Sequence, residues 1–322
     1  MEIEVNVAEA AAEEITPAET RAEITRLSAR GYVALRHVLV QKPRAEKSSD
    51  DELGSTVGVA VHERRHRALL LYLLMLTAWP WLAENRRPLP GAAWIRALTA
   101  PGALTWSPST LSRAWADLSD MGLVEVERKR EGRARRVLPR REDGQGLYDA
   151  PAGRRDRNNM YFVLPDNFWL EEIFAKLTLP GLAMLLIIAK ETNHKSEMYL
   201  PYSFGPKWYG LSPKSVQNGI KDLDKHGLVN IRHQTFKAPL SATGSSTRIW
   251  YSLTGAFAHD ARSALRTTAR VERTRRLVAQ QRKALPVAPT ATPEEQTPIA
   301  SEAPKSRRRW KGVRGDATES QR

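Results

Sequence analysis

The sequence contains no cysteine. Disulfide bridges, thiolate metal ligands and cysteine nucleophiles are therefore excluded as chemistry for this chain. A Walker loop, a Rossmann glycine fingerprint and the serine-hydrolase string G-x-S-x-G are missing as well. Because the common sequence signatures of enzymes are absent, we predict a protein that is not an enzyme and that needs no cofactor.

Long apolar runs are also scarce. The longest one, at residues 68–82, contains Pro80 and falls short of the roughly 20 residues that span a bilayer. The first twenty residues are acidic, whereas a secretory signal begins with basic residues and an apolar core. We therefore expect residues 68–82 to form a buried core helix, in a cytoplasmic, nucleoid-associated protein with no membrane partner.

Basic residues are in excess. The 322 residues include 50 Lys and Arg against 36 Asp and Glu, which gives a formal net charge of +14. Such an excess favours a polyanionic partner, namely DNA, RNA or an anionic membrane surface. A basic composition alone does not identify the partner, so the choice among these depends on where the charges lie in the chain.

The length of the chain is typical of about two domains, and shifts in composition divide it into segments. Within the first segment, residues 20–41 could form a short helix or strand, to which we assign no function. The expected segments are an acidic, largely flexible N-terminal arm (1–55), a first globular domain (56–142), a linker (143–159), a second globular domain (160–258), a basic helix (259–285) and a disordered, Pro-rich, basic tail (286–322).

An internal repeat is the strongest signal in the sequence. Residues 105–128 align without gaps on residues 210–233, and an apolar helix and a Leu-Pro pair precede both copies. Apolar residues also match at Leu111/Val216, Trp115/Ile220 and Val126/Ile231. The identical pairs are Ser107/Ser212, Pro108/Pro213, Asp117/Asp222, Leu118/Leu223, Gly122/Gly227, Leu123/Leu228 and Val124/Val229.

Each copy predicts the order helix, Leu-Pro segment, helix, turn, helix, strand, turn, strand. Ser107 and Ser212 stand where a helix N-cap belongs, and a proline follows each at the first helical position. Gly122 and Gly227 supply the left-handed residue that ends a helix. Alternating residues then predict a β-hairpin, with its tip at residues 131–132 in the first copy and 238–246 in the second.

This order resembles the winged helix-turn-helix fold. The string S-P-x-[ST] followed by D-L and G-L-V is similar to the recognition-helix segment of MarR- and GntR-type regulators. Two such domains in one chain look like plasmid replication initiators, and the segment MYFVLPDNFWL (160–170) is similar to helix-turn-helix proteins of actinobacterial mobile elements. The resemblance implies a mostly α fold with small β wings, namely two tandem winged helix-turn-helix domains plus flexible termini.

The third helix of each copy offers candidate DNA contacts. On a helical wheel, Arg113 in the first copy and Asn218 in the second point away from the apolar face. Arg can pair with guanine edges, and Asn or Gln with adenine edges. Any solvated helix face is polar, but here the helix follows a turn and precedes a wing in both copies. The candidates are Ser109, Thr110, Ser112, Arg113, Lys214, Ser215, Gln217, Asn218 and Lys221, with Ala116 on the same face.

The predicted wings are basic, the first more densely so. Residues 123–142 hold eight positive residues against four Glu, a pattern that suits phosphates or a minor groove. Residues 260–283 hold eight positive residues against two acids, and a DNA-tracking helix, a solvated helix and an oligomerisation arm all remain open for them. The candidate wing contacts are Arg128, Lys129, Arg130, Arg133, Arg135, Arg136, Arg232, Lys237 and Arg248, with His233 beside them.

One string suggests different chemistry. Residues 62–66 read H-E-R-R-H, which matches the zinc-binding pattern H-E-x-x-H and makes His62 and His66 candidate metal ligands. Both intervening residues are Arg, and Glu84 is the one candidate for a third ligand. The segment also stands where the first helix of a winged domain should begin, so a charged helix start is the favoured interpretation.

We therefore expect a sequence-directed double-stranded DNA-binding protein, foremost a transcriptional regulator, with a homodimer as one open oligomeric state. The alternative is a plasmid or mobile-element replication initiator or partition protein, which would use the same domains on repeated sites. A zinc metallopeptidase fused to a DNA-binding module is the third and weakest alternative.

Overall fold

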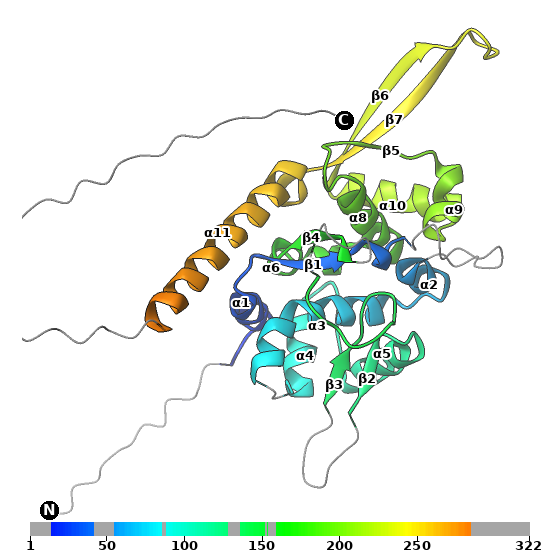
Figure 1. Ribbon diagram of the computed structural model, residues 1–322. Helices are drawn as coiled ribbons and strands as arrows, with labels where there is room; N and C mark the ends of the chain where they lie inside the picture. The colour runs from blue at the N-terminus through cyan, green and yellow to red at the C-terminus, as the bar shows by residue number, and fades with distance from the viewer. Residues whose placement is uncertain are drawn as a thin grey trace, which may run out of the picture. The chain divides into compact units, whose positions relative to one another are not determined.

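The computed structural model describes residues 14–41, 55–85, 88–127, 136–151, 153 and 159–284. Over these residues the chain is mostly helical, with small antiparallel sheets of two or three strands (Figure 1). The expected mostly helical fold with small β elements is thereby confirmed. Of these residues, those up to Arg276 form one compact unit, and those from Leu277 on belong to a second unit. Among the helices of the described ranges, none is long and apolar enough to cross a membrane.

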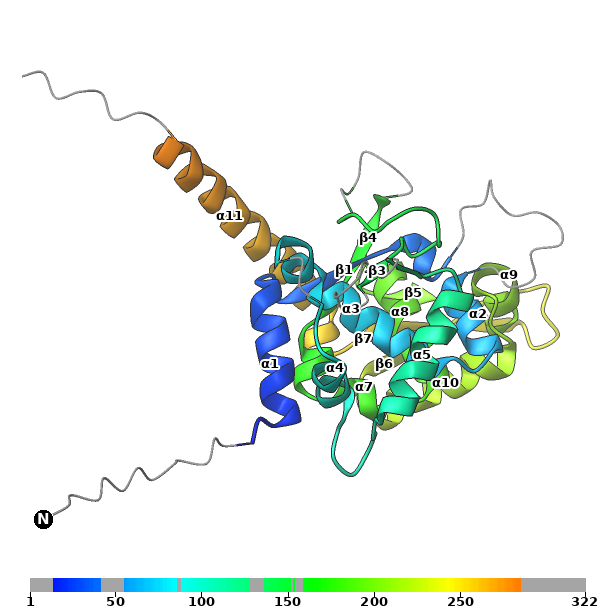
Figure 2. The ribbon, with the colours of Figure 1, turned by 90° about the horizontal axis from the view of Figure 1, so that it is seen from below.

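The first copy of the repeat is built around one apolar helix. Every residue from 68 to 78 is buried, so the expected core helix is confirmed, and α1, α4 and α5 pack against it (Figure 2). Pro80 lies inside this helix, near its end. The elements of the first copy are α2 (Thr56–His62), α3 (His66–Asn85), α4 (Gly91–Leu98), α5 (Pro108–Asp120), β2 (Val124–Val126) and β3 (Val137–Pro139).

The second copy has the same order of helices and a longer hairpin. The strands β6 and β7 pair antiparallel from Val229↔Leu253 to Lys237↔Ser245, and β5 joins β7 to give the strand order β5-β7-β6. The β6–β7 hairpin extends away from the helices (Figure 1). The elements are α8 (Leu179–Glu191), β5 (Met198–Tyr199), η4 (Tyr202–Phe204), α9 (Gly205–Tyr209), α10 (Pro213–Lys225), β6 (Val229–Lys237) and β7 (Ser245–Leu253).

The ends of α5 and α10 follow the predicted capping. The Ser107 hydroxyl accepts from the Thr110 backbone N–H at 3.2 Å, and the Ser212 hydroxyl accepts from the Ser215 N–H at 3.1 Å. At the other end, Gly122 and Gly227 adopt φ values of +67° and +66°. Local sequence therefore fixes both helices, because each cap satisfies backbone groups that the helix itself leaves unpaired.

Residues 17–41 are part of the compact unit, which differs from the expected flexible arm. The helix α1 (Pro17–Ser28) precedes the buried strand β1 (Tyr32–Arg36) and the turn η1 (His37–Leu39). β1 pairs antiparallel with β4 (Tyr161–Pro165), which comes just before α6 (Asn167–Leu170) and α7 (Ile173–Lys176). The apolar stretch in β1 needs a partner strand to satisfy its backbone, and the second half of the chain supplies it.

Two buried arginines hold these parts together. Arg21 of α1 donates to the Ala97 and Thr99 carbonyls at the C-terminal end of α4, and it also pairs with Glu172 in the second half of the chain. Arg36 of β1 forms an ion pair with the buried Glu142. The two copies lie within one compact unit, and α1 contacts α3 and α4 of the first copy as well as α6, which precedes the second copy.

The last described element is α11 (His259–Ala284), which follows the turn η5 (Gly255–Phe257). Its start is fixed by Arg262, whose guanidinium donates to the carbonyls of Ala189, Thr192 and Phe257. A helix is thus present where the sequence predicted one.

Candidate nucleic-acid interface

The polar face of α5 is open to solvent. Ser109, Ser112, Arg113 and Ala116 are exposed, and Thr110 is half-buried. The opposite face buries Leu111, Ala114 and Leu118. Arg113 forms no hydrogen bond or ion pair with the residues that the structure describes. Its guanidinium is therefore available to an external acceptor.

The polar face of α10 is arranged in the same way. Lys214, Asn218 and Lys221 are exposed, whereas Ser215 and Gln217 are half-buried. Lys214 Nζ lies 3.4 Å from Gln217 Oε1, which is the one side-chain contact between these candidates. The opposite face packs on α8 through Val216, Gly219 and Ile220. Both third helices thus present a row of hydrogen-bonding side chains.

The first wing is described in part. β2 and β3 pair from Val124↔Pro139 to Val126↔Val137, and the Glu127 N–H donates to the Arg136 carbonyl at 2.9 Å. Arg136 is half-buried at the start of the returning strand. Five candidates lie outside the described residues, namely Arg128, Lys129, Arg130, Arg133 and Arg135.

In the second wing, two of the three candidates already have partners. Arg232 binds Glu197 through Nε–Oε1 at 3.0 Å and Nη2–Oε2 at 2.5 Å. The Arg248 guanidinium lies 4.7 Å from the ring centre of Phe236. Lys237 and His233 are exposed. The ion pair with Glu197 neutralises Arg232, which the sequence could not show, whereas Arg248 keeps its charge beside an aromatic ring.

Aromatic residues that the sequence analysis did not single out share this sheet face. Trp250 pairs across the strands with Arg232 and Tyr199, and its ring lies 5.6 Å from the Arg232 guanidinium. Trp250 Nε1 donates to Gln234 at 2.9 Å. The alternation of side chains along a strand could have revealed this face, because it places Arg248 and Trp250 on the same side.

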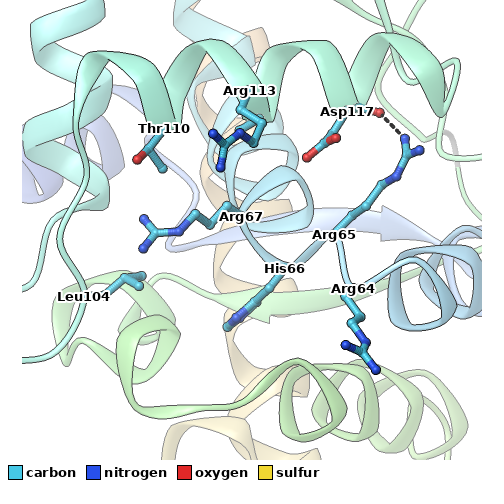
Figure 3. Close-up of a pocket in the computed structure, with 9 residues that line it drawn as sticks. Arg64, Arg65, His66, Arg67, Leu104, Thr110, Arg113 and Asp117 are labelled. Atoms are coloured by element: carbon cyan, nitrogen blue, oxygen red, sulfur yellow. Dashed lines mark hydrogen bonds between the residues drawn. The ribbon is translucent and has the colours of Figure 1, made fainter.

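A basic cleft of about 490 Å³ opens between α5 and the corner that joins α2 to α3 (Figure 3). Thr110, Arg113 and Asp117 line it from α5, and Arg64, Arg65 and Arg67 line it from the corner. In Figure 3, Arg113 and Asp117 point from α5 toward Arg67 and Arg65, while Arg64 lies on the side away from α5. The cleft therefore adjoins the exposed face of α5.

The two histidines of the H-E-x-x-H string do not lie on one helix. His62 ends α2 and is exposed, whereas His66 begins α3 and faces the cleft. Burial lowers the pKa of His66 to about 4, and its Nε2 atom has no hydrogen-bond partner among the described residues. Glu84 lies at the opposite end of α3. Among the described residues, no three His, Asp or Glu side chains are placed to hold a metal ion.

The basic segment after residue 258 divides into two parts. Arg262 is buried, and Arg266 donates to the Asn193 side chain and carbonyl, so both have structural partners. Arg270, Arg273 and Arg275 are exposed. The charge that remains for an external partner in this helix is therefore smaller than the composition suggests.

Comparison of the chain with protein-family models, with curated proteins and with solved structures found no match. Function is therefore inferred from the geometry of the described residues.

Proposed function

We propose that this protein binds double-stranded DNA in a sequence-directed way through two tandem winged helix-turn-helix domains. The observation that carries the proposal is the duplicated helix–helix–helix–hairpin order, with an exposed polar face on the third helix of each copy. A helix of this kind, preceded by a turn and followed by a hairpin, is the element that enters a major groove. The strand order β5-β7-β6 of the second copy supports the assignment of its hairpin as a wing.

The side chains on these faces suit the chemistry of base edges. Arg113 can form a bidentate pair with guanine, and Asn218 can form one with adenine. Ser109, Ser112 and Lys214 can donate to bases or phosphates. The net charge of +14 adds a long-range attraction to the polyanion.

Transcriptional regulation is the first candidate for the biological role. Replication initiation or partition of a plasmid or mobile element is the second, and one observation favours it. Both copies lie within one compact unit, and the β1–β4 ladder joins the segments that precede them. A single chain therefore presents two third helices. Tandem sites beside an origin would support initiation, whereas a promoter palindrome would support regulation.

The test is a selection from randomised duplexes with the full chain at physiological salt. We expect an enriched site, bound more tightly than a scrambled duplex of equal composition and more tightly than either of its single strands. Affinity for this site should fall with salt, with a log–log slope of roughly −0.9 for each phosphate contact. Failure to enrich any site, or preference for single strands, would contradict sequence-directed duplex binding.

A further inference from the structure

The cleft beside α5 concentrates positive charge that the protein does not neutralise. Arg65 is held by Glu63, at 2.5 Å, and by the Asp117 carbonyl, at 2.8 Å. The side chains of Arg64 and Arg113 form no hydrogen bond or ion pair with the described part of the chain. The one carboxylate of the lining, Asp117, is outnumbered by four guanidiniums. The cleft therefore carries a net positive charge.

Arg67 is fixed in the cleft without a counter-ion. Its Nη1 atom donates to the Thr105 carbonyl at 2.6 Å, and its guanidinium lies 5.2 Å from the Trp106 ring centre. Burial lowers the pKa of Arg67, because no carboxylate among the described residues compensates for the lost hydration. A guanidinium held in one position by neutral groups is prepared to bind an anion.

Arg64 stands at a backbone position that favours glycine. The corner after α2 is closed by hydrogen bonds from Arg65 N to Ala60 O at 2.8 Å and from Arg64 N to Val61 O at 3.3 Å. α5 and α10 end in the same pattern, but with Gly122 and Gly227 in the left-handed position that Arg64 occupies at φ +59°. A left-handed arginine is strained, and such strain concentrates where a side chain has a function.

In the second copy the matching carboxylate is used differently. Asp222, the counterpart of Asp117, accepts from the Thr178 N–H and hydroxyl at 2.8 Å, just before α8 begins. Gly181 allows this approach, since a Cβ there would lie 2.1 Å from Asp222 Oδ2. In the first copy the residue just before α3 is Arg65, which contacts the Asp117 carbonyl instead and leaves the carboxylate without a hydrogen bond among the described residues.

We propose that the cleft binds phosphate groups of a ligand through Arg64 and Arg67, with Arg113 also in its lining. Guanidinium groups match phosphate geometry with paired hydrogen bonds, and a volume of about 490 Å³ accommodates more than one phosphate. The phosphates come from the backbone of bound DNA or from a phosphorylated small molecule. In the first case the proposal rests on the proposed function and deepens it. In the second, the ligand competes with DNA for Arg113.

The probe is inorganic pyrophosphate, titrated calorimetrically into the full chain at low salt. We expect Arg64→Gly to weaken pyrophosphate binding at least tenfold and to leave the thermal midpoint unchanged or higher, since glycine relieves the backbone. Asp117→Asn should instead tighten binding, because it removes the only carboxylate of the cleft lining. The matched control is Arg26→Ala, which removes an exposed arginine of α1 that pairs with Glu23.

A second arm measures the salt dependence of duplex binding for the same variants. If the salt dependence of duplex binding becomes shallower by about one log–log unit in Arg64→Gly, the phosphates belong to DNA, whether or not pyrophosphate binds. Pyrophosphate binding that is lost in Arg64→Gly while the duplex slope is unchanged assigns them to a small molecule. If pyrophosphate does not bind and the slope does not change, the proposal is overturned. Should the wild type bind no duplex, the proposed function fails, and the pyrophosphate arm alone decides the role of the cleft.

Discussion

Arg36 Nη1 lies 2.8 Å from Glu142 Oε2, and the two side chains are 1% and 0% exposed. Glu142 also accepts from the Arg36 backbone N–H at 2.9 Å, and Arg36 reaches Asp149 at 2.7 Å. The network joins β1 to the segment that follows the first hairpin. Arg36 in the first strand thus contacts the base of the first hairpin.

We predict that Glu142→Ala lowers the free energy of unfolding by about 3–5 kcal/mol, because it leaves Arg36 buried without its main counter-ion. Urea denaturation of the full chain measures the effect. The matched control is Glu23→Ala, which removes the exposed partner of Arg26 and should leave the unfolding midpoint unchanged. Equal effects of the two variants would show that the buried pair has no special role.

The sequence predicted the elements that local chemistry determines. The caps of α5 and α10 depend on residues within one turn of each helix end, so Ser107, Ser212, Gly122 and Gly227 were readable from the sequence alone. The β1–β4 ladder was not, because it joins distant segments and each strand is too short to identify its partner. The buried roles of Arg21 and Arg36 were equally hidden, since an isolated arginine in a sequence looks like a solvated one.

The packing of α8 against α10 depends on Gly219. A Cβ at this position would lie 2.4 Å from both Met184 Cγ and the Pro180 carbonyl. We expect Gly219→Ala to destabilise the protein by roughly 1–3 kcal/mol through overpacking, despite the higher helix propensity of alanine. The control is Gly91→Ala at the start of α4, where the nearest atom is at 3.6 Å and the change should be neutral or stabilising. A stabilising Gly219→Ala would mean that the two helices can separate without cost.

Asp166 predicts a pH dependence of stability. The residue is 7% exposed, its Oδ1 atom has no hydrogen-bond partner in the described part of the chain, and burial raises its pKa to about 7. The folded state therefore holds the proton more tightly than the unfolded state, and this contribution to stability is lost as the pH rises toward and through 7. Asp166→Asn should stabilise the protein, and the gain should grow by roughly 2–3 kcal/mol between pH 5 and pH 8.5. Urea denaturation at the two pH values measures it, and a gain independent of pH would contradict the assignment.

The candidate interface was predictable in part, for a related physical reason. The exposed faces of α5 and α10 follow from helical periodicity, so Arg113, Lys214 and Asn218 lie where the sequence placed them. The partners of Arg232 and Arg248 depend on cross-strand neighbours, which the sequence did not reveal. The cleft depends on the contact between the α2–α3 corner and α5, and its single local signal was the basic string at residues 64–67.

Under the proposed function, the third helices and the hairpins should differ in what they contribute to DNA binding. Arg113→Ala and Asn218→Ala should each cost roughly 1–3 kcal/mol on the preferred site and should relax base preference at one position, because a side chain that reads a base edge contributes discrimination. Arg133→Ala and Lys237→Ala should weaken binding to every duplex about equally, since phosphates carry no base identity. The control is Ser119→Ala, an exposed change near the C-terminal end of α5.

A randomised-duplex selection with the wild type and these variants separates the two kinds of contact, once each variant is shown to fold. Both third helices should matter if the duplication places two reading heads on one site, so Arg113→Ala and Asn218→Ala should relax different positions of that site. If the helix variants kept the wild-type preference while the wing variants changed it, the hairpins would be the reading elements. If neither class affected binding, the duplicated domains would be protein-interaction modules, because an exposed polar helix face can also contact another protein.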